Sequence, residues 1–197
     1  VPGGRPPLHE TSITASHYAL DSHAVLKREP NRVHLDGFIS YPTAVYTVPY
    51  GVIVPKQVDN LLLPVPVSGS HIGFSTLRME PCWMALGQAA GVAAALAIDH
   101  QVKVQRVDIS KMQSALINQK STLIYFKDVP YTDPAFPVVQ FMGLKGYLPE
   151  WNARLHDAVD DETLKQWSAL SGYRLEAQVG RSTRLEVLTN LFKQIKP

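Results

Sequence analysis

The sequence has little that could crosslink it and little net charge. Its 197 residues include a single cysteine, Cys82. One cysteine excludes an internal disulfide and a zinc site built from several cysteines. Nineteen Lys and Arg residues face 17 Asp and Glu residues, which leaves a formal net charge of +2. This charge is too small to indicate nucleic acid or an anionic membrane as the main partner, so we expect no nucleic-acid binding.

The sequence also shows no targeting segment. It begins at Val1 with no methionine, no basic stretch and no apolar signal core. We therefore expect the chain to be a fragment of a longer protein. The compartment stays open, and a periplasmic or secreted location is compatible with the sequence.

The composition is that of a folded chain, with 45% apolar and 18% charged residues. Ten of the 15 prolines lie in residues 1–100, which favours strands and loops there. Apolar residues at helical spacing dominate the second half. We predict an α+β fold: a small mixed sheet with a long buried helix rich in Ala and Gly, followed by an α-helical C-terminal subdomain. The predicted division is 1–102 and 103–197.

The expected elements follow from local patterns. Strands are predicted at 33–39, 44–48, 52–54 and 61–67, whereas residues 11–23 show no clear period. Helices are predicted around Met112, Leu116 and Ile117, and at 134–145, 160–170 and 182–195. Thr183 and Glu186 have capping-box spacing at the start of the last helix.

The most informative element is a helix predicted at residues 81–98, a stretch of eighteen residues without charge. Such a length reaches the threshold for a membrane span. The stretch is rich in Ala and Gly, contains Gln88 and lacks basic flanks, so we expect a buried helix and no membrane span. Gly87 and Gly91 share one face, which would let a strand or a flat ligand approach closely.

Several segments together resemble the C-terminal end of the FAD-dependent oxidoreductase family, some of whose members are named putative xanthan lyase. The segments are Val48-Pro49-Tyr50-Gly51-Val52-Ile53-Val54-Pro55-Lys56-Gln57-Val58-Asp59-Asn60-Leu61-Leu62, Ser68-Gly69-Ser70-His71, Leu77-Arg78-Met79-Glu80-Pro81 and Leu86-Gly87-Gln88-Ala89-Ala90-Gly91, with Asp21-Ser22-His23 as a looser match. Their order and spacing match the family over about a quarter of the chain.

The resemblance implies hydride transfer from a small-molecule or sugar-like substrate to the flavin. It places the backbone N–H groups of Met79 and Glu80, together with the Arg78 cation, at the flavin edge. It implies a substrate-contacting or proton-relaying role for His71, and the same for His23. The alternatives are an Arg78 that pairs with Glu80 or another carboxylate, and loop histidines that are structural or merely exposed.

Two departures from the family pattern affect the cofactor. No G-x-G-x-x-G occurs in the sequence, so we expect half of the FAD site to come from a missing N-terminal nucleotide-binding domain. Leu63-Pro64-Val65-Pro66 stands where many members carry Ala-Gly and a polar residue. We therefore expect the isolated chain neither to retain FAD nor to turn over.

Two rival functions come from other resemblances. Residues 126–148 and 183–188 are similar to parts of an S-layer homology repeat, which implies either a helical bundle docked on the oxidoreductase part or a module that binds cell-surface glycan. The xanthan lyase name implies instead a polysaccharide lyase, with Tyr50, His71 and Arg78 as base, acid and carboxylate-neutralising groups.

Overall fold

The computed structural model describes residues 5–23, 30–31 and 38–195. The first half contains four short strands, β1 (Ser12–Ser16), β2 (Leu20–Ser22), β3 (Ile39–Tyr41) and β4 (Tyr46–Pro49). The 3-10 helix η2 (Tyr50–Ile53) follows, and then helices α1 (His71–Leu77) and α2 (Glu80–Asp99). The second half has the 3-10 helix η3 (Val104–Arg106) and helices α3 (Ile109–Asn118), α4 (Phe136–Leu144), α5 (Asp161–Ser171) and α6 (Arg184–Ile195).

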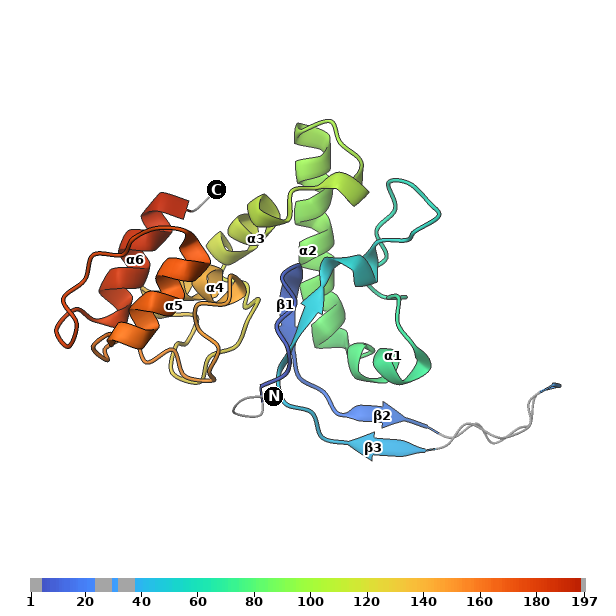
Figure 1. Ribbon diagram of the computed structural model, residues 1–197. Coiled ribbons are helices and arrows are strands. Elements are labelled where there is room, and N and C mark those ends of the chain that lie inside the picture. The colour runs from blue at the N-terminus through green and yellow to red at the C-terminus, as the bar shows by residue number, and fades with distance from the viewer. Residues whose placement is uncertain (1–4, 24–29, 32–37, 196–197) are drawn as a thin grey trace.

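The predicted α+β class is confirmed, although the sheet differs from the predicted mixed sheet. The described strands form two separate antiparallel pairs, β1 with β4 and β2 with β3. β1 and β4 lie along α2, and the β2–β3 pair lies below α1 in this view (Figure 1). The strand expected at 33–39 lies mostly outside the described residues, and β4 corresponds to the strand expected at 44–48.

Two of the predicted strands are wrong. Residues 52 and 53 lie within η2. Tyr50, the first residue of η2, is buried, and its hydroxyl donates to the carbonyl of Val104 at 2.9 Å. Residues 61–67 form a loop. Pro64 and Pro66 have no N–H to donate to a sheet, so this apolar run cannot sustain strand pairing.

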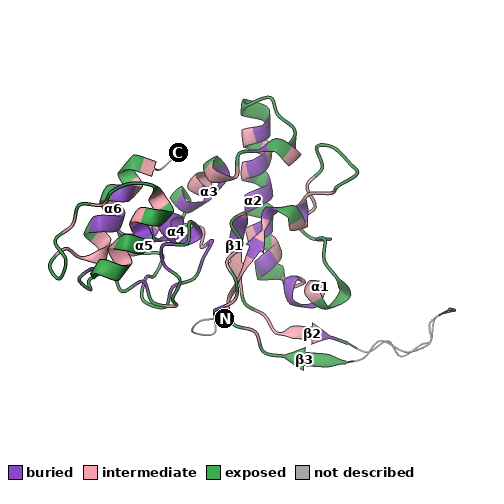
Figure 2. Cartoon of the chain, viewed as in Figure 1, coloured by how far each residue is buried: buried purple, intermediate pink, exposed green. Residues whose placement is uncertain are grey.

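The long helix α2 has the predicted extent, with one face buried rather than its whole circumference. Leu86, Ala89 and Ala93 are fully buried, whereas Met84 and Ile98 are exposed at 75% and 76%. Buried and exposed stretches accordingly alternate along α2 (Figure 2). A Cβ added at Gly87 or Gly91 would meet no atom within 4 Å, so none of the described strands approaches the helix there. Within the described chain, α2 alone is long and apolar enough to cross a membrane, and 33% of that window is buried inside the protein. The absence of a membrane span stays a prediction.

Helices α5 and α6 begin where their capping residues predict. Asp160 accepts a bond from the Thr163 N–H at 2.7 Å, and Gly172 ends α5 with a left-handed φ of 72°. Thr183 and Glu186 form the predicted capping box, with bonds of 2.8 and 3.2 Å.

One continuous hydrophobic core joins both halves of the chain, from Ile13 in β1 to Leu191 in α6. The Ser12 hydroxyl donates to the Leu123 carbonyl at 2.8 Å, and the Ala15 N–H donates to the Thr122 carbonyl at 2.8 Å. The division at residues 102 and 103 stays a prediction, and the packing crosses it.

Candidate functional site

A polar pocket lies between the end of β2, the segment before α1 and the junction of α1 with α2. Its volume is about 460 Å³. The lining combines residues from two sequence-distant segments: Asp21, Ser22 and His23 from the first, and Gly69, Ser70, His71, Phe74, Ser75 and Arg78 from the second. The fold thus brings the predicted His71 and Arg78 together with the looser Asp21-Ser22-His23 element.

Asp21 is the centre of the hydrogen bonding in this pocket. Its Oδ2 accepts from Arg78 Nη2 at 2.8 Å, from the Tyr18 hydroxyl at 3.3 Å, and lies 3.2 Å from His23 Nε2. Arg78 Nη2 also lies 3.4 Å from the Asp21 carbonyl. The Asp21 side chain is 21% exposed, so these contacts form in a partly desolvated place. One carboxylate oxygen therefore links an imidazole, a guanidinium and a phenol.

Side-chain hydrogen bonds fasten β2 and the chain before it to α1. The Thr76 hydroxyl donates to the Tyr18 carbonyl at 2.5 Å, and the Tyr46 hydroxyl donates to the Thr76 carbonyl at 2.9 Å. The Asp21 N–H donates to Ser75 Oγ at 3.2 Å. The bonds to Ser75 and Thr76 involve short side chains with few rotamers, so they hold the Asp21 segment against α1 at little cost in entropy.

The electrostatics of the pocket favour a charged Asp21. The hydrogen bond from His23 lowers the pKa of the Asp21 carboxyl, with smaller contributions in the same direction from Tyr18 and Arg78, while desolvation opposes them. Asp21 is therefore a carboxylate at neutral pH.

Arg78 forms an ion pair with a carboxylate, which was one of the two alternatives from the sequence. Its partner is Asp21 and not Glu80. It is the C-terminal cap of α1 and directly precedes Met79, the N-cap of α2. Among the residues that the structure describes, no side chain caps the start of α2, and Pro81 has no N–H. The backbone N–H groups of the first turn, including that of Glu80, are therefore available at the positive end of a 20-residue helix.

His71 lies at the first position of α1, which corrects the expectation that it belongs to a loop. Ser70 caps this short helix by accepting the Gly73 N–H at 3.0 Å. His71 is exposed and faces the same pocket as His23 and Arg78. The structure places it where a substrate contact is feasible, and its catalytic role stays a prediction.

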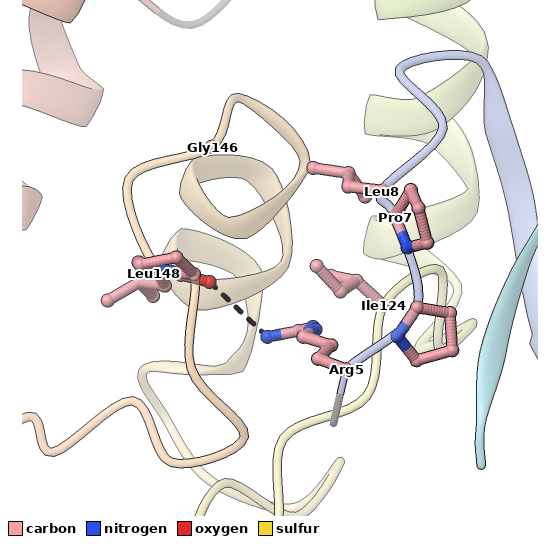
Figure 3. A pocket seen from close by; sticks show the side chains of 8 residues that line it. Arg5, Pro7, Leu8, Ile124, Gly146 and Leu148 are labelled. Carbon is pink, nitrogen blue, oxygen red and sulfur yellow. Dashed lines mark hydrogen bonds between the residues drawn. The ribbon is translucent and has the colours of Figure 1, made fainter. Parts of the chain in front are cut away.

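A second, apolar cavity of about 350 Å³ lies where the N-terminal segment meets the C-terminal helices (Figure 3). Arg5 borders it and is itself buried, with its guanidinium donating to the carbonyls of Leu148 at 3.3 Å and Tyr125 at 3.1 Å, and to that of Glu150. The guanidinium carbon lies 4.6 Å from the centroid of the Phe126 ring. Arg5 is thus committed to carbonyls and aromatic rings, and this cavity offers few polar groups for chemistry.

The comparison with family models decides the relationship. The FAD dependent oxidoreductase model matches residues 5–116, more than half of the chain. The chain belongs to the FAD dependent oxidoreductase family. Neither the curated proteins nor the solved structures gave a match.

The family match supports a flavin oxidoreductase type of function, since members of the family use FAD. The matched range, residues 5–116, includes both segments that line the polar pocket. The comparisons lend no support to the xanthan lyase name or to the S-layer homology tail. No group of three or more metal-binding side chains occurs in the part of the chain that the structure describes.

The donor set at the start of α2 fits the polar edge of a flavin. Uncapped N–H groups favour the negative charge that a reduced flavin carries, and the nearby Arg78 guanidinium shares its charge with the Asp21 carboxylate. The sequence offers no G-x-G-x-x-G turn for the pyrophosphate. The fit therefore concerns the ring system and not the ADP half.

Proposed function

We propose that this chain supplies the flavin-edge and substrate side of an FAD-dependent oxidoreductase that passes a hydride from a substrate to the flavin. The observation that carries the proposal is the Asp21–Arg78 pair at 2.8 Å, which joins two segments of the family match in one pocket beside the uncapped start of α2. The flavin, when bound, supplies the two-electron acceptor.

The residues of this chain have separate tasks in the proposal. The N–H groups of Met79 and Glu80 hold the negatively charged edge of the flavin, and the Arg78 guanidinium adds a fixed cation. His71 binds the substrate or relays its proton from the first turn of α1. The size and polarity of the pocket suit a small-molecule or sugar-like substrate.

The ADP half of FAD requires residues outside this sequence. Dinucleotide-binding folds hold the pyrophosphate at a glycine-rich turn that leads into a helix, and that motif is absent from the 197 residues. We propose a separate nucleotide-binding domain as the partner that completes the site. On this basis, the chain alone neither retains FAD through purification nor turns over.

The proposal is tested by following backbone amides by NMR while the chain is titrated with FMN or, separately, with ADP at millimolar concentration. FMN carries the ring system without the adenosine, so we expect it to shift the amide signals of Met79 and Glu80, whereas ADP leaves them unchanged. Arg78→Gln should weaken the FMN response by about threefold, as expected for a partly exposed cation.

Arg106→Gln is the matched control, because Arg106 is exposed in η3 at the opposite end of α2. An equal response to ADP, an equal loss in the Arg106 variant, or no response to FMN would each refute the flavin-edge assignment. Stoichiometric FAD retained by the purified chain would refute the need for a nucleotide-binding partner.

A further inference from the structure

We propose that Asp21 and His23 form a carboxylate–imidazole pair in which His23 accepts, at Nδ1, the proton of a hydroxyl group on an alcohol substrate. The inference rests on the proposed function, because the flavin there supplies the oxidant. It assigns the proton transfer to His23, leaves His71 as a substrate contact, and adds a substrate class to that function.

The contact between His23 and Asp21 determines which imidazole nitrogen can accept a proton. His23 Nε2 lies 3.2 Å from Asp21 Oδ2, and a carboxylate can only accept hydrogen bonds. In the neutral ring, Nε2 therefore carries the proton and Nδ1 presents its lone pair. When Nδ1 takes up a proton, the imidazolium that results is stabilised by the carboxylate at Nε2.

The surrounding groups maintain this arrangement. Arg78 and Tyr18 donate to the same Asp21 oxygen, which keeps it a charged acceptor. The Phe38 ring and the His23 imidazole form a T-shaped pair with centroids 6.0 Å apart. His71 is the remaining titratable residue of the described pocket lining. The His23 side chain is 70% exposed, so a proton taken from the substrate can pass to water.

The chemistry balances with a hydroxyl substrate. The O–H bond would break with its proton passing to His23 Nδ1, the C–H bond would break with its electron pair, and a carbonyl bond would form. A flavin, when bound, would supply the two-electron acceptor for that hydride, so the oxidation of the alcohol would be balanced. Asp21 keeps its charge and acts as a positioning residue, while His23 contacts the substrate.

The first test needs no flavin. Diethyl pyrocarbonate acylates neutral imidazole nitrogens, and the rate at each histidine can be followed by peptide mass spectrometry. We expect His23 to react about threefold faster than His17 in the same sample, as the effect of one exposed carboxylate partner. His17 is exposed and lies outside the pocket lining, so it is the internal control.

Asp21→Asn should bring the ratio of the two rates to about one, and Asp21→Glu should restore part of it, because only a carboxylate supports the imidazolium. If the role of Asp21 were only structural, Asp21→Asn would leave the ratio of the two rates unchanged, and Asp21→Glu would have nothing to restore. A ratio that is the same in the wild-type protein and in Asp21→Asn would overturn the pair.

The substrate class is tested in the same assay with two probes. Ethylene glycol carries hydroxyl groups, and 1,2-dimethoxyethane is its ether counterpart without them. We expect ethylene glycol at high concentration to slow acylation of His23 relative to His17, and dimethoxyethane to leave the ratio unchanged. Equal protection by both probes would overturn the assignment to alcohols.

The FMN titration separates the two proposals. If His23 behaves as expected and FMN leaves the α2 amides unshifted, the proposed flavin function fails and the oxidation step fails with it, while the pair itself stands. If FMN binds as expected and Asp21→Asn leaves the His23 rate unchanged, the flavin function stands and the pair is refuted.

Discussion

Replacement of Gly143 by alanine should destabilise the protein, although alanine is the better helix former. An alanine Cβ at this position in α4 would lie 2.8 Å from Cε2 and Cζ of Phe126 and 3.3 Å from Cγ2 of Ile124. Favourable carbon contacts lie at about 3.5–4.0 Å, so a ring must move by most of an ångström. Phe126 is 3% exposed and lies under the Arg5 guanidinium, which leaves it little room to do so.

The magnitude follows from two opposing effects. Overpacking of a core costs about 1–3 kcal/mol, whereas the change from glycine to alanine in a helix gains at most about 1 kcal/mol. We therefore expect a net loss of about 1–2 kcal/mol in the free energy of unfolding. For a chain of this length, that loss lowers Tm by about 2–8 °C.

Gly87→Ala is the matched control, because it makes the same change in a helix where the new Cβ meets no atom within 4 Å. It should gain about 1 kcal/mol and raise Tm by about 2–4 °C. Urea and thermal unfolding followed by circular dichroism measure both variants. A Gly143→Ala protein as stable as the wild type would refute the packing argument.

Two further predictions concern the site and the core. His23→Ala removes the main interaction that lowers the pKa of Asp21, so this pKa should rise toward its ordinary value, measured by ¹³C NMR of the carboxyl group. The lowered pKa of Asp21 stabilises the folded state at every pH above the ordinary carboxyl pKa, and this stabilisation is lost as the pH falls through the pKa of the folded state. In His23→Ala, the free energy of unfolding should therefore fall less over this acidic pH range than in the wild-type protein. Gln140→Leu should lower the free energy of unfolding by about 2–4 kcal/mol, because the buried amide of Gln140 accepts two backbone N–H groups and donates to the Ile124 carbonyl at 2.7 Å. The exposed Gln166→Leu is its control in urea unfolding, and equal losses in the two variants would contradict the prediction.

The helices could be predicted because their signals are local. An unbroken uncharged run with Pro81 in its first turn marks α2, and the reciprocal bonds of Thr183 and Glu186 mark the start of α6. Caps and periodicity act within a few residues, so they can be read without knowledge of the tertiary structure.

Strands β1 and β2 could not be predicted in the same way, because their burial depends on distant partners. β1 contains Ser12 and Thr14, which are buried at 0% and 5% exposure although their residue types favour the surface. Ser12 donates to the carbonyl of Leu123, 111 residues away in sequence. The pattern of apolar and polar residues does not reveal such a distant partner. The opposite error occurs at 61–67, where the apolar run predicts a strand but its prolines prevent strand pairing.

The candidate site shows the same limit. His71 and Arg78 could be identified from their segment alone, but the partner of Arg78 lies 57 residues earlier, in an element of only three residues. The sequence contains 17 Asp and Glu residues, and residue type alone does not show which of them pairs with Arg78. Only the bonds that hold β2 against α1 select Asp21.

The shared carboxylate couples the two proposed roles. Asp21 Oδ2 binds both Arg78 and His23, so the charge that supports the imidazolium is also the charge that offsets the guanidinium. When His23 takes up a proton, its attraction to Asp21 competes with that of Arg78, and more of the Arg78 charge is left for an anionic neighbour. An oxidation that delivers a proton to His23 while it builds negative charge on the flavin would use both changes together. Substitution of Asp21 should therefore alter the FMN response at α2 as well as the reactivity of His23.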